Sequence, residues 1–204
     1  MNLLPFLFLV IVEPIPPEVD LGFIISAGST DASATLQQIK DVIKSFIYKY
    51  SSDRLRYGII SYGSTPRIEL TLRDSVNPDV TQQVDAILRP GGTPDLARAL
   101  QLGEKLLSSA RPNVQKVLVI ITDVKSGSSL SQIRLAVKSL DNKDIRVFAV
   151  AVGSELDSTG LSTATGSSKN IINSSNTDEP GKVREEIMTK IRQGKRSEMP
   201  LFKL

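Results

Sequence analysis

The sequence of 204 residues contains no cysteine and no histidine. Without these residues the chain has no thiolate or imidazole ligand for zinc and no Cys-His or Ser-His-Asp nucleophilic site. It also lacks the side chain that ordinarily exchanges protons near neutral pH. These two absences exclude a large share of enzyme mechanisms. The lack of cysteine leaves the redox compartment open, because many secreted domains of this size fold without disulfide bonds.

The sequence also lacks a large excess of either positive or negative charge. The chain has 25 Lys and Arg against 22 Asp and Glu, a formal net charge of +3 that is spread along its length. A nucleic-acid-binding face would concentrate basic side chains, so we expect no nucleic-acid partner. The local exception is the C-terminal stretch with Lys190, Arg192, Lys195 and Arg196, which we interpret as solvated.

Residues 3–12 form an apolar run that is too short to span a bilayer as a helix and has the length of a signal-peptide core. No basic residue precedes the run and no small-x-small cleavage site follows it, so a buried N-terminal segment stays an alternative. We expect residues 1–17 to be a signal peptide and Pro-rich linker, residues 18–193 one folded domain, and residues 194–204 a basic tail. This organisation predicts a secreted chain without a direct membrane span.

Strand-like and helix-like segments alternate along the rest of the chain. Apolar runs predict buried strands at residues 19–25, 55–62, 117–121 and 145–152, with a last strand at 170–172; residues 67–71 alternate in period two and predict an edge strand after a hairpin turn. Helical spacing predicts helices at about 34–50, 77–88, 93–110 and 133–140, near 161, and around 183–191. The alternation predicts an α/β fold, a doubly wound, mostly parallel sheet with one antiparallel edge strand and helices on both faces.

Three polar loops occur at positions where such a sheet binds ligands, namely residues 26–30, 91–93 and 122–123. We expect them to meet in one site. Thr93 is predicted to be the N-cap of its helix, with Pro94 in the first helical position. The first loop has neither Gly-x-Gly-x-x-Gly nor a phosphate-loop sequence, and Asp31 would repel a phosphate, so nucleotide binding is a minor alternative.

From about residue 18 to 192 the chain resembles a von Willebrand factor A domain, the module also found in integrins, matrilins and collagens. The resemblance rests on the acidic-apolar first strand that ends at Ser26, on Gly-Gly-Thr at 91–93, and on Val-Leu-Val-Ile-Ile-Thr-Asp at 117–123. It implies a metal-ion-dependent adhesion site, in which Asp-x-Ser-x-Ser of the first loop, a Thr of the second and an Asp of the third hold one divalent ion. In this family the partner often supplies an acidic group that completes the coordination.

The match to this site is partial. Thr93 and Asp123 agree with the family, but Ser26 stands where the family has Asp, Gly28 where it has the first Ser, and Thr30 where it has the second. Because Mg²⁺ and Ca²⁺ prefer carboxylate oxygens, we expect weakened or absent metal binding and no required cofactor. If Mg²⁺ or Ca²⁺ does bind, Ser26, Thr30, Thr93 and Asp123 are the predicted ligands.

These observations predict a non-catalytic adhesion or matrix-interaction module. It would bind an extracellular protein, such as a matrix component or a receptor, through its loops, with Ser29, Asp31, Asp95 and Lys125 as partner-binding residues. One alternative keeps a metal-bridged ligand site. Another is a nucleotide or phosphate-ester hydrolase, for which Asp31, Asp95 or Asp123 would be the general base. The oligomeric state stays open.

Residues 173–175, Asn-Ser-Ser, form an N-glycosylation sequon. Asn173 is therefore a candidate glycosylation site if the chain enters the secretory pathway. A glycan there would keep that edge of the domain out of any interface.

Overall fold

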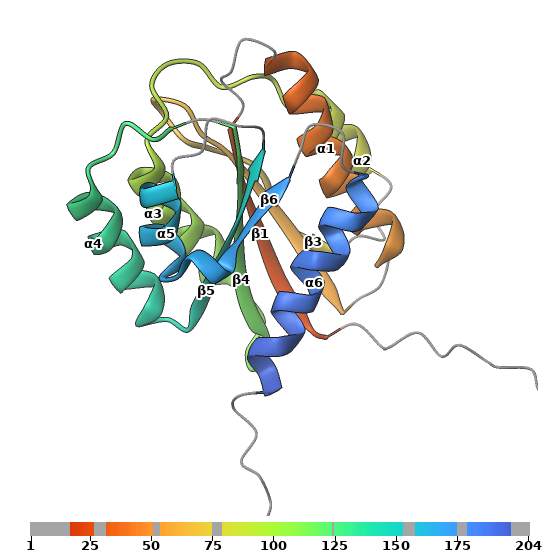
Figure 1. Cartoon of the computed structure of the whole chain (residues 1–204). Helices are drawn as coiled ribbons and strands as arrows, with labels where there is room; N and C mark the ends of the chain where they lie inside the picture. Colours follow the sequence, from red (N-terminus) through yellow and green to blue (C-terminus); the bar gives the residue numbers. More distant parts are fainter. Residues whose placement is uncertain are drawn as a thin grey trace, which may run out of the picture.

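A mostly parallel sheet forms the centre of the molecule (Figure 1). The computed structural model describes residues 17–26, 32–50, 54–74, 79–123, 125–152, 158–174 and 179–196. Within them, the order across the sheet is β3 (Arg67–Asp74), β2 (Leu55–Ser61), β1 (Val19–Ser26), β4 (Gln115–Thr122), β5 (Ile145–Val152) and β6 (Ile171–Ser174). Only the β2–β3 pair is antiparallel among these strands, and β3 is an edge strand, so the predicted fold class is confirmed.

Helices cover both faces of the sheet (Figure 1). One face carries α1 (Ala32–Lys49), α2 (Asp79–Ala86) and α6 (Pro180–Arg196); the other carries α3 (Leu96–Leu106), α4 (Leu130–Asp141) and α5 (Ser158–Thr165), with short 3₁₀ turns at Leu107–Ser109 and Ser168–Asn170. The backbone of α6 thus includes positions 194–196, which the sequence pattern assigned to the tail. None of the helices in the described ranges combines the length and apolar character needed to cross a membrane.

The apolar strands separate two hydrophobic cores. On one face Phe23 of β1 packs edge-on against Phe46 of α1, with ring centroids 5.4 Å apart. On the other face Ile24 joins the cluster formed with α3, α4 and α5. Both side chains of β1 are fully buried, and each such burial contributes about 1.5–3 kcal/mol. Burial on both faces explains why the central strands contain long apolar runs, such as residues 117–121 of β4 and 147–152 of β5.

Glycines lie where helix α3 packs against the sheet, and they permit a close approach. Gly22 of β1 and Gly58 of β2 are register partners, and a Cβ on either would meet Leu106 of α3 within 3.2 Å. Gly103 of α3 is placed in the same way against Leu118 of β4, at 2.7 Å. Helix α3 therefore keeps a fixed height above the sheet, which sets the position of the loop at its N-terminus.

A buried carboxylate, that of Asp20, anchors the amino end of β1. The side chain of Asp20 is fully buried, and its two oxygens accept hydrogen bonds from the Arg111 backbone N–H at 2.7 Å and from the Arg111 Nε at 2.9 Å. A guanidinium nitrogen of Arg56 lies 3.6 Å away. Arg111 also donates to the carbonyl of Arg54 at 2.9 Å. This cluster joins β1, β2 and the segment before β4 at the amino end of the sheet.

Candidate functional site

The strand order reverses between β1 and β4, and the candidate site lies at their carboxyl ends. Ser26 is the last residue of β1 and is the register partner of Thr122, the last residue of β4. Asp123 follows directly. All three side chains are at least nine-tenths buried. The first and third predicted loops therefore start side by side, as the fold rule led us to expect.

The N-terminus of α3 lies at the same end of the sheet, and its cap differs from the sequence prediction. Asp95, not Thr93, is the N-cap, and the helix begins at Leu96. One oxygen of Asp95 accepts from the backbone N–H of Arg98 at 3.0 Å and from the hydroxyl of Ser128 at 2.9 Å. A carboxylate at this position also interacts favourably with the helix dipole, which explains why Asp95 takes the role predicted for Thr93.

The loop between β4 and α4 completes this cap. The hydroxyl oxygen of Ser126 accepts from the backbone N–H of Leu96 at 3.3 Å, and that of Ser128 accepts from the N–H of Ala97 at 3.0 Å. These N–H groups belong to the first turn of α3, which has no intrahelical partners for them. Sequence reasoning missed both serines, and the cluster Ser-Gly-Ser-Ser after a buried strand was the available signal.

The turn between β2 and β3 is bonded to the loop before α3. The backbone N–H of Asp95 donates to the carbonyl of Gly63 at 2.9 Å, and that of Ser64 donates to the carbonyl of Gly91 at 3.0 Å. A Cβ on Gly63 would lie 2.1 Å from the Gly91 oxygen, whereas a Cβ on Gly91 would meet nothing within 4 Å. Only glycine permits this approach at position 63.

We call this surface the rim, made of Ser26, residues 63–66, residues 91–95 and residues 123–129 apart from Val124, which lies outside the described residues. Ser29, Thr30 and Asp31 also lie outside them. Of the remaining predicted residues, Thr93 and Lys125 are exposed, Asp95 is half-buried, and Ser26 and Asp123 are buried.

The residues that the family pattern assigns to the metal site are a poor set of ligands for a resident divalent ion. The family pattern maps onto Ser26, Gly28, Thr30, Thr93 and Asp123, which supply one carboxylate, three hydroxyls and one position without a side-chain donor. Hard cations such as Mg²⁺ and Ca²⁺ are held mainly by carboxylate oxygens. The described residues contain no group of three or more acidic side chains placed to hold a metal. No step is therefore assigned to a metal at this site.

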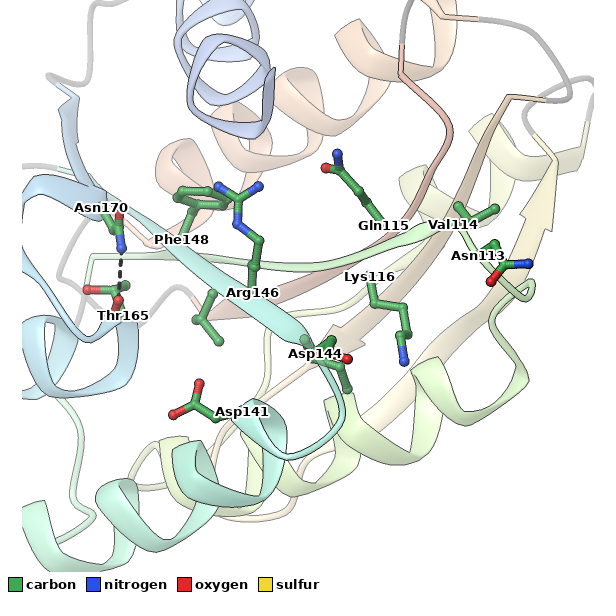
Figure 2. A pocket seen from close by; sticks show the side chains of 12 residues that line it. Asn113, Val114, Gln115, Lys116, Asp141, Asp144, Arg146, Phe148, Thr165 and Asn170 are labelled. Atoms are coloured by element: carbon green, nitrogen blue, oxygen red, sulfur yellow. Dashed lines mark hydrogen bonds between the residues drawn. The ribbon is translucent and has the colours of Figure 1, made fainter. Parts of the chain in front are cut away.

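A hollow of about 800 Å³ lies at the amino ends of β4 and β5, away from the rim (Figure 2). Arg146 projects into this region with its guanidinium 4.8 Å from the ring centre of Phe148. The same guanidinium donates to the backbone carbonyls of Lys190 and Ile191 in α6, at 3.2 Å each. These bonds give Arg146 a structural role, the attachment of α6 to the sheet, and we therefore place the candidate site at the rim.

A model of the von Willebrand factor type A domain matches residues 20–186. The chain belongs to this family. Its relatives include the mouse collagen alpha-1(XX) chain, 28% identical over 144 residues, and mouse von Willebrand factor A domain-containing protein 2, 33% identical over 104 residues. The first alignment covers 67% of this chain and 11% of the collagen; the second covers 50% and 13%. The chain thus spans about a tenth of the length of these relatives.

Solved structures share the fold at low sequence identity. Proximal thread matrix protein 1 from the mussel byssus has a TM-score of 0.73 and 17% identity, over 86% of this chain and 46% of that chain. The manganese-loaded TRAP protein of Plasmodium vivax has a TM-score of 0.67 and 16% identity, over 87% and 73%. A second structure of the mussel protein has a zinc-occupied MIDAS motif. The mussel protein thus holds zinc at this motif.

Proposed function

We propose that this von Willebrand factor A domain is a non-catalytic, extracellular protein-interaction module of the matrix type, which binds a protein partner through the rim. The observation that carries the proposal is that the rim loops bond directly to one another. The N–H of Gly127 donates to the carbonyl of Pro94 at 2.8 Å, in addition to the bonds at Asp95 and Gly63. A surface held in this way is preorganised, which lowers the entropy cost of binding.

The same bonds support recognition that does not depend on a metal. Ser128 and Ser126 connect the third loop to α3 through neutral hydroxyls, so no ion is needed to hold these segments together. Asp123 is then the one carboxylate of the family pattern left at the rim. The alternative is a Mg²⁺-bridged ligand site, which the metal-loaded relatives support. Whether Mg²⁺ is required for binding distinguishes the two.

A hydrolytic function finds less support. Of the three carboxylates considered as a general base, Asp95 caps α3 and lies 3.2 Å from the Nε of Arg98, so it is committed to the fold. Asp31 lies outside the described residues.

The matrix names of the collagen and mussel relatives also support an interaction module, and they are the reason for placing the domain outside the cell.

The rim is tested by reversing one exposed charge. Lys125→Glu changes a residue of the rim, and Lys138→Glu makes the same change on the exposed surface of α4 as a matched control. Binding is measured by surface plasmon resonance against purified matrix proteins that include fibrillar collagen, with EDTA present. We expect saturable binding that Lys125→Glu weakens and Lys138→Glu leaves unchanged. Equal effects of the two changes, or no binding to the panel, would contradict the proposal.

The metal is tested by restoring the missing carboxylate. We expect the melting temperature of the wild-type protein to be unaffected by Mg²⁺ or Mn²⁺, whereas Ser26→Asp gains stability from them. If the variant binds with a dissociation constant of about 0.1 mM, then about 5 mM ion stabilises it by about 2 kcal/mol. A wild-type protein whose binding to the matrix panel requires Mg²⁺ would favour the metal-bridged alternative.

Glycosylation at Asn173 stays part of the proposal. Asn173 lies in β6 with an exposed side chain, next to the buried Ser174. Expression in a secretory cell line, followed by treatment with an N-glycosidase, is expected to lower the apparent mass of the wild-type protein. Asn173→Gln would abolish that change, and a wild-type protein whose mass the enzyme does not alter would count against the site.

A further inference from the structure

Strand β6 is shorter than β5 and covers only part of it at the edge of the sheet. β4 pairs with β5 from Ile145 onward, whereas β6 pairs with it only from Ala149 onward. The residues that lead into β6 are described without a gap, and they form α5, a short turn and the 3₁₀ helix Ser168–Asn170 instead of a strand. Within the described residues, the stretch Ile145–Phe148 thus has a strand neighbour on its β4 side only. We call the other side of this stretch the open edge.

The hollow at the amino ends of β4 and β5 extends along the open edge (Figure 2). Its lining includes residues 145–148, which form that edge, together with Thr165 and Asn170 from the segment that leads into β6. A strand added there would lie about 4.8 Å from β5, and four of its residues would extend about 13 Å. The hollow measures about 800 Å³, within the range of about 300–1,000 Å³ for binding clefts. It therefore has room for a short extended segment.

The open edge keeps the regular backbone geometry of a strand because both cores hold its side chains. Ile145 and Val147 are buried in the core with α3, α4 and α5, and Phe148 is buried in the core with α1 and α6. Successive residues of a strand direct their N–H and C=O groups alternately to its two sides. Part of this backbone therefore faces the hollow, and such a row of groups is a template for pairing with another strand.

Hydrogen bonds around the hollow hold its shape. The side-chain amide of Asn170 donates to the carbonyl of Thr165 at 3.0 Å, and the Thr165 hydroxyl donates to the carbonyl of Leu161 at 2.9 Å. On the side of α6, the Arg146 guanidinium donates to two backbone carbonyls of that helix at 3.2 Å each. The hollow is therefore present before a partner arrives, which lowers the entropy cost of adding a strand.

Two carboxylates line the hollow from the side of α4 (Figure 2). Asp141 and Asp144 are both exposed, and neither forms an ion pair with another residue in the described ranges. The lysines beside them are engaged elsewhere: Lys143 pairs with Glu104, and Lys116 donates to the Lys143 carbonyl at 2.6 Å. Asp141 is the last residue of α4, where a carboxylate interacts unfavourably with the helix dipole, so helix stability does not account for it. These carboxylates can pair with a basic side chain of a partner.

We propose that the open edge binds an extended segment of a partner protein, which adds to the sheet as a strand and directs a basic side chain toward Asp141. Side chains alternate between the two faces of a strand, so the residues next to the basic one would face Phe148 and Arg146 on the side of α6 (Figure 2). A second basic residue there would be repelled by the Arg146 guanidinium. The segment is thus expected to carry one basic residue between two uncharged ones. This site is separate from the rim, and the inference does not depend on the function proposed for the rim.

The test is a ¹H–¹⁵N NMR titration of the whole chain with acetyl-Thr-Val-Lys-Val-Thr-amide. We expect shifts of the Val147, Phe148 and Asn170 amides and slower hydrogen exchange at the open edge. Two further peptides carry N-methyl groups, one on both valines and the other on the lysine and the last threonine. Alternate N–H groups of the peptide point to opposite sides of its strand. One N-methylated peptide is therefore expected to keep its binding, and the other to lose about tenfold or more in affinity, as the loss of two backbone hydrogen bonds predicts.

The charge is tested with Asp141→Asn, and Glu179→Gln is the matched control. Glu179 is also exposed, but it precedes α6, at the opposite end of that helix from the carbonyls that Arg146 contacts. We expect Asp141→Asn to weaken peptide binding about two- to fivefold, as loss of an exposed ion pair predicts, and Glu179→Gln to leave it unchanged. Replacing the peptide lysine with glutamine should weaken binding to the wild-type protein but not to Asp141→Asn. Both positions are exposed, so neither variant is expected to unfold the domain.

Equal affinities of the two N-methylated peptides would overturn the inference, and so would shifts confined to rim amides such as those of Ser64 and Gly91. Equal effects of Asp141→Asn and Glu179→Gln would also overturn it, because the predicted ion pair would then be absent. The two proposals fail separately, since Lys125→Glu is expected to bind the peptide as the wild-type protein does. Peptide binding at the open edge without any matrix binding would retain the edge and reject the matrix function. Matrix binding without peptide binding would retain the rim and reject the edge.

Discussion

Replacing Asp20 by Asn tests the buried anchor of β1. The Asp20 carboxylate is completely buried and accepts two hydrogen bonds from Arg111, at 2.7 and 2.9 Å, with Arg56 at 3.6 Å. Asparagine has nearly the same shape but no charge. The change therefore removes the counter-charge of two guanidinium groups without opening a large cavity.

The expected cost follows from the environment of these groups. Breaking a fully buried ion pair costs about 3–5 kcal/mol, because the remaining charge is left uncompensated. The Arg111 and Arg56 side chains are 26% and 20% exposed, so water can solvate them in part. Arg111 also keeps its bond to the carbonyl of Arg54. We therefore expect Asp20→Asn to lower the free energy of unfolding by about 2–3 kcal/mol, and the melting temperature by about 4–12 °C.

The assay is urea unfolding followed by circular dichroism, with Asp74→Asn as the control. Asp74 lies 4.0 Å from the same Arg56, but its side chain is 57% exposed. An exposed pair of this kind contributes about 0–1 kcal/mol. If Asp20→Asn and Asp74→Asn destabilise the domain equally, burial is not what makes the Asp20 cluster strong, and the reasoning fails.

Three further predictions concern the core, the surface and the rim. Burial raises the pKa of the Tyr57 hydroxyl, so its stabilising contribution is lost as the pH rises above about 10, and Tyr57→Phe should shift alkaline unfolding, measured by circular dichroism, to higher pH. The hydrogen bond from Lys143 lowers the pKa of Glu104, so this pair stabilises the fold above about pH 4 and less below it; the stability gap between wild type and Glu104→Gln should shrink on acidification in urea titrations. Ser128→Ala removes a cap of α3 and should cost about 0.5–2 kcal/mol, with faster hydrogen exchange at the Ala97 amide; unchanged exchange there would contradict the proposed cap.

The sequence predicts the sheet well because the central strands are buried on both faces and therefore contain apolar runs, such as residues 117–121 and 147–152. The sequence also predicts that the loops after β1 and β4 lie close together, because both follow the carboxyl ends of parallel strands, and Ser26 and Thr122 are register partners. The end of α2 was not predictable from the sequence. Ile87 keeps the helical apolar spacing and is buried, although it lies outside the helix. Spacing reports which residues are buried, and several backbone paths can bury the same residue.

The start of α3 shows the limit most clearly. Thr93 and Pro94 have the local pattern of a helix start, yet Asp95 is the cap, and its carboxylate accepts both from the Arg98 N–H and from the hydroxyl of Ser128, which lies 33 positions along the chain. The additional support from Ser128 is invisible to rules that consider neighbouring residues only.

The sequence by itself determined which chemical groups the domain possesses: no imidazole or thiol, Ser in place of Asp at position 26, and Asp123 as the carboxylate that still matches the family site. Those facts hold for any fold, because composition fixes the available atoms. Only the tertiary structure decided how these groups are used. Asp95 caps a helix, Asp20 is buried between arginines, and Leu88 stays exposed, because contacts between residues distant in the chain determine burial and hydrogen bonding.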